Sequence, residues 1–362
     1  WSAPDIHIDL ARLAKMAGAR FITEAVTGID ADAQLVSLEN RPPLRFDVLS
    51  LNIGGEPDLN AIDGAAEHCI PVKPIGRFRN RLEDLTATGH AGRLAVIGGG
   101  AAGCELALAL SKRWLDATGT RPQIDIFTRS ARLVPEMPAR AARLIFTSLT
   151  AAGIAVHCGQ TVTGVMANEL YLEDGSRHGF DVSFLVTAVA PPAWLANTGL
   201  TLDERGFVAV QRTLQSASHP HIFAAGDIAT LVDDPRPKAG VYAVRAGPVL
   251  AGNIRRHLDG RRLRRWSPQE RALAILGTAD GRAIGIRGTH ASASRAWWWV
   301  KKWIDRRWMA KYTNLKMPPP PPPAMFAGLK DRSAPDTDPA FEAMRCLGCG
   351  AKTGHETLAA AM

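Results

Sequence analysis

No apolar run in this chain approaches the ~20 residues that a membrane-spanning helix needs, which excludes a transmembrane protein. Aromatic residues make up only 6% of the 362 residues, and cysteine occurs five times, an odd number spread thinly. So few cysteines exclude a disulfide scaffold, and with no charged-then-apolar leader they predict a reducing, cytoplasmic compartment. Contents of 46% apolar and 22% charged residues exclude disorder, and at about 150 residues per domain the length predicts two domains or slightly more.

Most of the chain lacks a net positive charge. The formal net charge is +8, but residues 255–311 hold 15 Lys and Arg against four acidic residues. That segment alone therefore carries a net charge of +11, and the remainder carries −3. Because the basicity belongs to one segment and no base-reading module is visible, we expect no nucleic-acid partner.

Predicted strands and helices alternate over the first two thirds of the chain, which indicates a doubly wound α/β fold. The predicted helices span residues 9–17, 77–85, 101–114, 140–152 and 239–258. The predicted strands span residues 19–26, 34–38, 46–53, 94–97, 124–127, 185–190, 208–210 and 222–225, with strand-like pieces near residues 155, 161, 170 and 184.

A glycine turn joins one buried strand to a helix. Gly98, Gly100 and Gly103 satisfy the pattern G-x-G-x-x-G between the strand 94–97 and the helix 101–114. In this context the first glycine allows a tight turn, the second lets a pyrophosphate approach the backbone, and the third lets helix and strand pack closely. The helix N-terminus adds free N–H groups and a partial positive charge. The turn therefore predicts a dinucleotide site; the alternative is a tight glycine turn without a ligand.

The acid expected about 20 residues beyond such a turn, which would accept the ribose 2′-hydroxyl, is missing. The strand 124–127 is followed by Thr128 and Arg129, with Arg132 beyond, and Asp125 lies within the strand rather than at its tip. Arginines at this point suit a 2′-phosphate. We therefore expect NADPH to be used at least as well as NADH; the alternative is that both arginines are merely solvated.

A second predicted buried strand ends in Gly226-Asp227 and is followed by a helix from about Ala239. Together with the glycine turn at 98–103 and the strand that ends at Gly54, this pattern resembles the pyridine nucleotide-disulfide oxidoreductase family, and within it the type II NADH dehydrogenase-like flavoproteins. The resemblance covers about residues 5–312.

The resemblance implies an α/β fold with two Rossmann-like (FAD/NAD(P)-binding) three-layer domains, FAD and NAD(P)H as cofactors, and hydride transfer from nicotinamide C4 to flavin N5. The FAD-binding domain is split around the NAD(P)H-binding domain. Residues 1–70 and 196–260 match the two parts of the FAD domain, residues 71–195 match the NAD(P)H domain, and residues 261–316 form a basic, tryptophan-rich C-terminal interface segment.

The same resemblance implies roles for individual residues. Asp227, next to Gly226, matches the acid that hydrogen-bonds the ribityl chain of FAD, and Gly54 matches the glycine that ends the first crossover strand. The helix from Ala239 would aim its positive end at the flavin pyrimidine. Glu105 matches an acid near the nicotinamide and is the candidate catalytic residue of this part. No residues are assigned to a metal.

Three family features are absent. The first G-x-G-x-x-G, which holds the FAD pyrophosphate, should precede Trp1, so we expect the chain to be a fragment. A glycine normally found near Val189 is missing. No redox C-x4-C pair is present, and Cys69, Cys104 and Cys158 are isolated, which predicts that they are small buried groups.

A C-x-x-C pair lies beyond a proline spacer. Six consecutive prolines, Pro318–Pro323, stiffen a linker at residues 317–338. The pair Cys346/Cys349 alone has three interpretations: half a zinc site, a thioredoxin-like dithiol, or a catalytic cysteine with a neighbour. The string Arg345–Lys352 resembles the N-terminal signature of selenide, water dikinase (selenophosphate synthetase), which implies a truncated kinase domain at residues 339–362.

This second resemblance implies that Cys349 is the catalytic cysteine and Lys352 the catalytic lysine of the kinase, with ATP and Mg²⁺ as cofactors of that domain. Lys352 beside the thiol would favour the thiolate. Fusions in this order, flavoprotein, linker and kinase, occur in the family. Because the metal-binding acids and the ATP-binding core are missing, we expect no selenophosphate synthesis by this chain alone.

Five of the nine tryptophans fall within residues 297–308, interleaved with lysine and arginine. On a helix, Trp299, Trp303 and Ile304 share one face with basic residues beside it. Such a face suits an interfacial helix on anionic lipid at the inner face of the cell membrane. The alternative is a helix that packs its tryptophans on the flavin domain or on the partner in a homodimer.

The first functional hypothesis is an FAD-dependent NAD(P)H oxidoreductase that passes electrons to a small-molecule acceptor, either an oxidised selenium species or a quinone. The second is a non-catalytic flavoprotein module that tethers the kinase. The third takes the chain as a selenide, water dikinase. Anaerobic bleaching of a bound flavin by NADPH separates the first two.

Overall fold

The computed structural model describes residues 8–89, 92–187, 189–313 and 315. The chain divides into a large unit of residues 22–307 and a small unit formed by the two ends of the chain, residues 1–21 and 308 onward. Within the described ranges, no helix combines the length and the apolar character that crossing a membrane requires.

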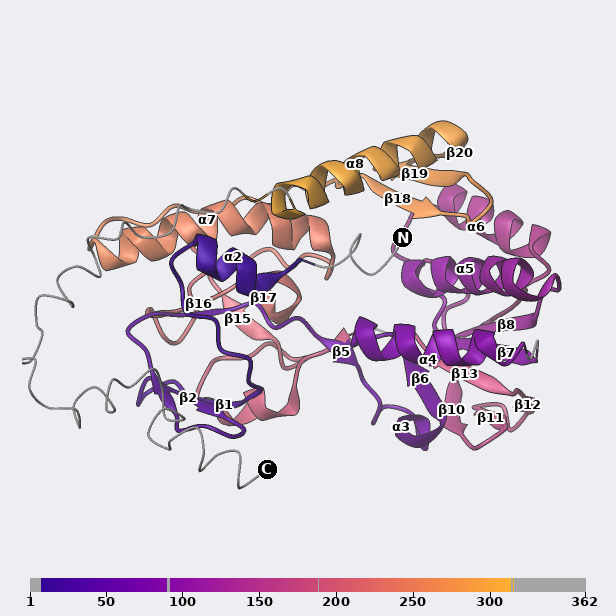
Figure 1. The fold of residues 1–362 in the computed structure, drawn as a ribbon, viewed down its shortest axis with the longest axis horizontal. Helices are drawn as coiled ribbons and strands as arrows, with labels where there is room; N and C mark the ends of the chain where they lie inside the picture. Colours follow the sequence, from indigo (N-terminus) through magenta and orange to yellow (C-terminus); the bar gives the residue numbers. More distant parts are fainter. Residues whose placement is uncertain (1–7, 90–91, 188, 314, 316–362) are drawn as a thin grey trace, which may run out of the picture. The chain divides into compact units, whose positions relative to one another are not determined.

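A five-stranded parallel sheet is the centre of one half of the large unit, here called the parallel-sheet lobe (Figure 1). In spatial order its strands are β6 (Cys69–Pro71), β13 (Val182–Leu185), β7 (Arg93–Ile97), β8 (Gln123–Thr128) and β9 (Ala155–Cys158). Every neighbouring pair is parallel. The strand order reverses between β7 and β13, and this switch point is where doubly wound folds bind ligands.

Different layers cover the two faces of this sheet. Because side chains alternate along a strand, Leu94 and Val96 of β7 face one core, while Ala95 and Ile97 face another. The helices of the lobe are α3 (Ala65–His68), α4 (Ile75–Ala87), α5 (Ala101–Thr118) and α6 (Ala139–Ala151). The opposite face meets a small antiparallel sheet of β10 (Val162–Val165), β11 (Glu169–Leu172) and β12 (Arg177–Gly179). The lobe therefore has three layers, with α4, α5 and α6 on one side and the small sheet on the other.

Parallel pairs of short strands build the other half of the large unit. β4 (Leu49–Leu51) pairs with β16 (Ile222–Ala224), and β15 (Val208–Val210) pairs with β17 (Ala229–Leu231). Two segments from either side of the parallel-sheet lobe in the sequence thus share one core, to which α7 (Gly240–Leu258) contributes Ala246. The remaining elements are β5 (Glu56–Pro57), which pairs antiparallel with β14 (Val189–Ala190), and the 3-10 helices η1 (Ala193–Asn197) and η2 (Gly226–Ile228).

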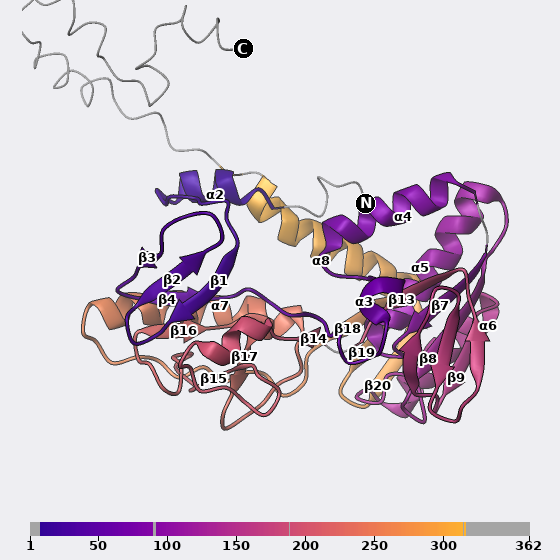
Figure 2. The same ribbon diagram turned by 90° about the horizontal axis from the view of Figure 1, so that it is seen from below.

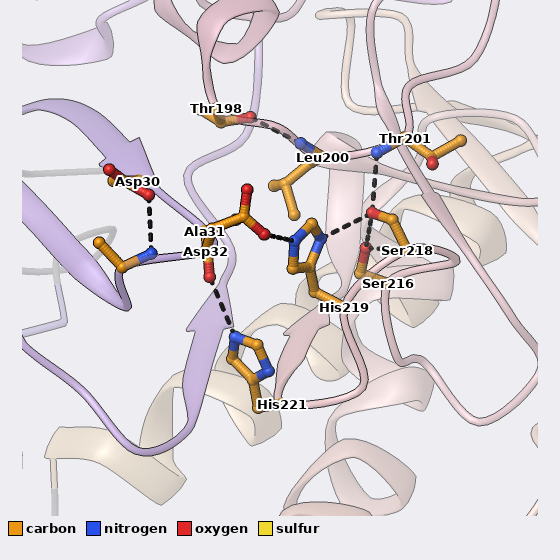
Figure 3. A network of polar contacts seen from close by, with 11 residues as sticks. Asp30, Ala31, Asp32, Thr198, Leu200, Thr201, Ser216, Ser218, His219 and His221 are labelled. Carbon is orange, nitrogen blue, oxygen red and sulfur yellow. Dashed lines mark hydrogen bonds and ion pairs between the residues drawn. The ribbon is translucent and has the colours of Figure 1, made fainter.

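An antiparallel sheet of β1 (Val26–Asp30), β2 (Leu35–Leu38) and β3 (Leu44–Arg45) is anchored to this half by polar contacts (Figure 3). His221 Nε2 donates to the carbonyl oxygen of Ala31 at 3.2 Å. The His219 ring lies between the Asp32 carboxylate, 3.2 Å from Nε2, and the Ser218 hydroxyl, 2.8 Å from Nδ1. These contacts attach the turn after β1 to the segment that leads into β16.

Most predicted helices and strands are confirmed within a few residues, but two predicted strands are wrong. Residues 185–190 are not one strand, because Leu185 ends β13 and Val189–Ala190 form β14, which belongs to another sheet. The strand predicted at residues 19–26 is wrong as well. Only its last residue, Val26, is in a strand, because the pairing of β1 begins there, opposite Leu38 at the end of β2. The prediction of three buried cysteines is confirmed for Cys69 and Cys104 and wrong for Cys158. Cys158 is the last residue of β9, whose two end residues are exposed while its two middle residues are half-buried.

The basic segment contains a sheet that its composition did not reveal. β18 (Ala274–Gly277), β19 (Ala283–Arg287) and β20 (His290–Ser294) are antiparallel, and their apolar side chains Leu276, Ile284 and Ile286 join the core formed with α5 and α6. The following helix, α8 (Arg295–Thr313), lays the Trp297 ring against Gly285. The sheet therefore gives the start of α8 a fixed support.

The small unit has its own short helix, α2 (Leu10–Met16). Asp9 caps it by accepting a hydrogen bond of 3.0 Å from the backbone N–H of Arg12, as expected for an N-cap carboxylate. The last residues of α8 also belong to this unit, where the rings of Trp308 and Tyr312 meet edge to face at 5.2 Å. The helix predicted at residues 9–17 is therefore confirmed.

Candidate functional site

The predicted glycine turn lies at the switch point of the parallel sheet. Gly98 has a φ of +130°, and a Cβ at this position would overlap with the carbonyl oxygen of Val186 just beyond β13. A Cβ at Gly103 would overlap with the carbonyl oxygen of Gly98. Only glycine fits at both positions, so the close packing of helix against turn depends on them.

Gly100 differs from its neighbours because nothing lies within 4 Å of the position that its Cβ would take. It is also the N-cap residue of α5, and no side chain caps the helix there. The first N–H groups of a helix have no partner within the helix, so this end presents bare donors and the positive end of the helix dipole. The open space and the bare donors fit a pyrophosphate at this turn.

The two arginines beyond β8 have different surroundings. Arg132 is held in place by the protein: its Nη2 donates to the carbonyl oxygens of Pro135 at 2.6 Å and Met137 at 2.8 Å. Arg129, directly after the last residue of β8, is exposed. Of the two, Arg129 is therefore the one available to an anionic ligand.

A pocket in the other half of the large unit lies beside Gly226 and Asp227. A Cβ at Gly226 would overlap with the Asn52 side chain, and the φ of Gly226 is +78°. The residues around the pocket come mainly from η2, β17 and the start of α7: Val210, Leu214, Ala225, Gly226, Asp227, Ala229, Leu231, Arg236, Pro237, Lys238, Ala239, Tyr242, Ala243 and Trp266. Ala239 is the N-cap of α7 and offers no side-chain cap, so a second bare helix end opens beside the pocket.

Asp227 is linked to the first crossover segment by Lys73. The Lys73 ammonium lies 3.5 Å from Asp227 Oδ2 and donates to the carbonyl oxygen of Gly55 at 3.3 Å. Gly54, which follows β4 in the sequence, has a φ of +73° and nothing within 4 Å of its Cβ position. Asp227 and the segment at Gly54 therefore belong to one region.

Sequence reasoning missed two lysines of this region, Lys73 and Lys238. Lys238 Nζ donates to the carbonyl oxygen of Ala229 at 2.7 Å and to the Thr230 hydroxyl at 2.8 Å, and lies 4.0 Å from the centroid of the Phe207 ring. Burial lowers the pKa of Lys238 to about 8. Neither lysine stands in a motif, but Lys238 immediately precedes the N-cap of α7, a position that could have drawn attention to it.

Glu105 lies in the second turn of α5 and faces β18. Its carboxylate accepts a hydrogen bond of 2.7 Å from the backbone N–H of Gly277. Burial raises the pKa of Glu105, against the opposite effects of that N–H group and of Lys301. The residue is thus a partly buried carboxyl on the same helix that begins at the glycine turn.

The structure therefore gathers the predicted residues into two groups. Gly98, Gly100 and Gly103 form one turn next to the strand that precedes Arg129, and Gly226, Asp227 and Ala239 surround one pocket. Cys349 and Lys352 lie outside the described residues. Gly100 begins α5 directly after β7, whereas β17 lies between Gly226 and the start of α7. Each group nevertheless has the uncapped start of a helix beside it.

Known proteins are similar to this chain in sequence and in fold. Residues 6–247 match the family described as pyridine nucleotide-disulphide oxidoreductase. Demethylphylloquinone reductase NdbB of Synechocystis sp. is 29% identical over 297 residues, which cover 77% of this chain and 72% of that protein. NADH dehydrogenase-like protein YutJ of Bacillus subtilis is 20% identical over 290 residues, covering 80% and 79%.

Among solved structures, the sulfide:quinone oxidoreductase of Aquifex aeolicus superposes with a TM-score of 0.71 and 17% identity, covering 90% of this chain and 83% of that one. At this identity the likeness concerns the fold, and it confirms the α/β, Rossmann-like FAD/NAD(P)-binding architecture. The matched range spans more than half of the chain and includes the glycine turn at 98–103 and Gly226-Asp227. The chain belongs to the pyridine nucleotide-disulphide oxidoreductase family.

Proposed function

We propose that the chain is an FAD-dependent NAD(P)H oxidoreductase that passes electrons to a small-molecule acceptor. The observation that carries this proposal is the pair of helices α5 and α7, each of which begins beyond a strand and a glycine turn and has no side-chain cap. Two bare helix ends are two sites for anionic groups. A module that only tethers another domain has no need of both.

In the parallel-sheet lobe, the residues that would hold NAD(P)H are those of the glycine turn. Gly100 leaves room for the pyrophosphate, and the N–H groups of the first turn of α5 would bind its oxygens. Arg129, exposed beyond β8, would bind a 2′-phosphate, which favours NADPH. When bound, nicotinamide and flavin supply the hydride-transfer chemistry.

In the other half, Asp227 would hydrogen-bond the ribityl hydroxyls of FAD. Lys73 keeps the Asp227 carboxylate in place, at 3.5 Å, and the start of α7 places partial positive charge beside it. Glu105 would contribute a carboxyl near the nicotinamide, oriented by the N–H of Gly277. Burial raises the pKa of this carboxyl, against the effects of the Gly277 N–H and of Lys301.

A quinone is the acceptor that we favour. Its support is the name of the relative from Synechocystis sp., a demethylphylloquinone reductase. An oxidised selenium species is the other candidate, and its support is the string Arg345–Lys352, which resembles the start of a selenide, water dikinase. Reoxidation of the reduced protein by a soluble quinone or by selenite distinguishes the two acceptors.

The kinase resemblance leads to a second proposal, that residues 339–362 belong to a selenide, water dikinase domain in which Cys349 and Lys352 are catalytic and ATP and Mg²⁺ bind. The sequence string alone supports it. In a protein that carries the whole kinase domain, Cys349→Ser should abolish selenide-dependent ATP hydrolysis. Unchanged hydrolysis would exclude the assignment.

We further propose that α8 brings the protein to the cytoplasmic face of a membrane. Trp299 and Trp303 are 65% and 62% exposed, and Ile304 lies beside them at 40%. Lys302 and Arg307 lie over the rings of Trp299 and Trp303, at 5.7 and 5.6 Å from the centroids. Exposed tryptophan with a basic margin suits an anionic lipid surface.

One experiment tests the oxidoreductase proposal. The chain is purified, its visible flavin absorption is recorded after reconstitution with FAD, and NADPH is added without oxygen. We expect the flavin band to bleach and to return when a quinone is added. A bound flavin that stays oxidised with both NADPH and NADH would leave only the tethering function.

A further inference from the structure

Three metal-ligating side chains from three strands meet in the parallel-sheet lobe, away from the glycine turn. They are Asp125 of β8, His157 of the neighbouring edge strand β9, and His178 of β12 in the small antiparallel sheet. Figure 2 shows β8 and β9 side by side in the parallel sheet. His157 Nε2 lies 2.8 Å from Asp125 Oδ1, and His178 Nε2 lies 3.4 Å from Asp125 Oδ2. One ligand atom from each residue lies within 4.8 Å of the other two.

The buried position of Asp125 is energetically unfavourable for a carboxylate. Only 3% of it is exposed, and among the described residues it is the only charged one in the buried class. The same face of the sheet carries Ala95, Ile97 and Phe127, which pack in an apolar core. A buried carboxylate without adequate partners is strongly unfavourable, so this position calls for a compensating positive charge.

The protein groups around Asp125 satisfy only one of its two carboxylate oxygens. Oδ1 has the hydrogen bond with His157, but the buried atoms Asp125 Oδ2 and His178 Nε2 have no hydrogen-bond partner among the described residues. They lie within ion-pair distance of each other without the geometry of a hydrogen bond. Two buried polar atoms that face each other without hydrogen-bond partners indicate a binding site for a ligand that contacts both.

Phe127 holds both imidazoles in place. Its ring stacks on His157 at 4.6 Å between centroids and 8° between planes, and it meets His178 edge to face at 4.8 Å. Register explains this arrangement, since Phe127 is the strand partner of His157 and lies two residues from Asp125 on the same face of β8. The imidazoles are therefore positioned before any ligand arrives.

We propose that Asp125, His157 and His178 bind a divalent transition-metal ion of the Zn²⁺ type. Ligand bonds of about 2.0–2.2 Å in tetrahedral geometry separate ligand atoms by about 3.3–3.6 Å. The separation of 3.4 Å between His178 and Asp125 lies in this range, and the hydrogen-bonded separation of 2.8 Å between His157 and Asp125 would widen by about 0.5 Å when an ion binds. Two imidazoles with one carboxylate suit Zn²⁺, Co²⁺ or Ni²⁺ and not Mg²⁺ or Ca²⁺. The histidine side chains, 34% and 24% exposed, give the ion a path from solvent.

Such an ion would cross-link the two sheets of the lobe, because β8 and β9 belong to one and β12 to the other. Three protein ligands leave a fourth position to water. Binding to the native state and not to the unfolded chain raises the melting temperature. The site therefore predicts that a bound metal ion stabilises the parallel-sheet lobe.

The test uses the full chain, without a polyhistidine tag, carrying Cys346→Ser and Cys349→Ser so that the C-x-x-C pair cannot bind the ion. After treatment with EDTA, Zn²⁺ is titrated by calorimetry and Co²⁺ by visible absorption. We expect one equivalent of each, tetrahedral Co²⁺ bands, a higher melting temperature with Zn²⁺ and no effect of Mg²⁺. Binding of less than one equivalent would overturn the proposal.

Single variants locate the site. His157→Gln, His178→Gln and Asp125→Asn should each weaken Zn²⁺ binding by at least about tenfold, the loss that even an outer-shell partner causes. His219→Gln, which alters another histidine paired with an aspartate, and Cys158→Ser, next to His157, should bind normally. Circular dichroism checks that each variant folds. If Asp125→Asn does not fold, imidazole ¹⁵N shifts of His157 and His178 on adding Zn²⁺ decide: unchanged shifts would show a histidine–aspartate pair without a metal.

Discussion

The carboxylate of Glu105 accepts a hydrogen bond of 2.7 Å from the backbone N–H of Gly277. This bond connects α5, the helix that begins at the glycine turn, with β18 of the sheet that supports α8. Burial raises the pKa of the Glu105 carboxyl, so its charged form is disfavoured where it lies. The position and protonation of this candidate catalytic group thus depend on a segment far away in the sequence.

The pH dependence of stability follows from the raised pKa of Glu105. In the unfolded chain Glu105 loses its proton at about pH 4.3, and in the folded chain it does so at a higher pH. The stability of the fold therefore falls as the pH rises from the unfolded-state pKa to the folded-state pKa. Glu105→Gln removes this loss and keeps an oxygen for the N–H of Gly277. Measured by calorimetry, the melting temperature of the variant should therefore rise relative to that of the native chain as the pH increases above the ordinary glutamate pKa of about 4.3. Glu39→Gln, at an exposed site, should show no such trend; a gain that does not vary with pH would contradict the argument.

Gly100→Ala tests the nucleotide turn without disturbing the fold. A methyl group there meets no protein atom within 4 Å, so the melting temperature should change little. Because it occupies space assigned to the pyrophosphate, KM for NADPH should rise by about tenfold or more. Gly252→Ala on α7 also meets nothing within 4 Å and is the matched control for steady-state kinetics. Equal KM values in both variants would place the nucleotide elsewhere.

Arg129→Gln tests coenzyme choice. We expect kcat/KM for NADPH to fall by about tenfold to 100-fold while that for NADH stays nearly unchanged, since only NADPH carries the 2′-phosphate. Arg143→Gln, another exposed arginine of the same lobe, is the control. An equal loss with both coenzymes would assign Arg129 to the pyrophosphate or to the fold instead.

The double variant Trp299→Ser/Trp303→Ser tests the membrane proposal. Flotation with anionic vesicles should recover the native chain and lose most of the variant, and high salt should weaken the binding of the native chain. Leu258→Ser removes another exposed apolar side chain, 64% exposed on α7, and should still float. If the native chain floats with neither neutral nor anionic vesicles, α8 has a different partner.

The parts that could be predicted from the sequence are those with local causes. The turn from β7 to α5 was predictable because Gly98, Gly100 and Gly103 are needed by packing and space within a few residues of one another. The helices α4, α6 and α7 were predicted nearly in full, since their apolar periodicity can be recognised without any partner.

The remainder depends on contacts between distant segments. The sheet β18–β20 was hidden by the charge of its flanking residues and gains its burial only against α5 and α6. The Lys73–Asp227 contact and the cluster of Asp125 with two histidines join residues from separate strands. In the sequence, Asp125 is only an acid within a strand, where it cannot accept a hydrogen bond from a ribose hydroxyl. Its neighbours in space cannot be inferred from sequence spacing.

The pairing of β4 with β16 has a consequence for the order of folding. Every strand of the five-stranded sheet lies between Cys69 and Leu185, so that sheet can pair once this stretch has been synthesised, before β18–β20 add their apolar side chains to its helix-covered core. β4 is made earlier but has to wait for Ile222–Ala224 before it gains its parallel neighbour. Closing so long a loop is slow, and the Leu49–Leu51 edge stays unpaired meanwhile. A ribosome-bound chain that stops before residue 222 should therefore hold a protease-resistant lobe preceded by a cleavable N-terminal segment.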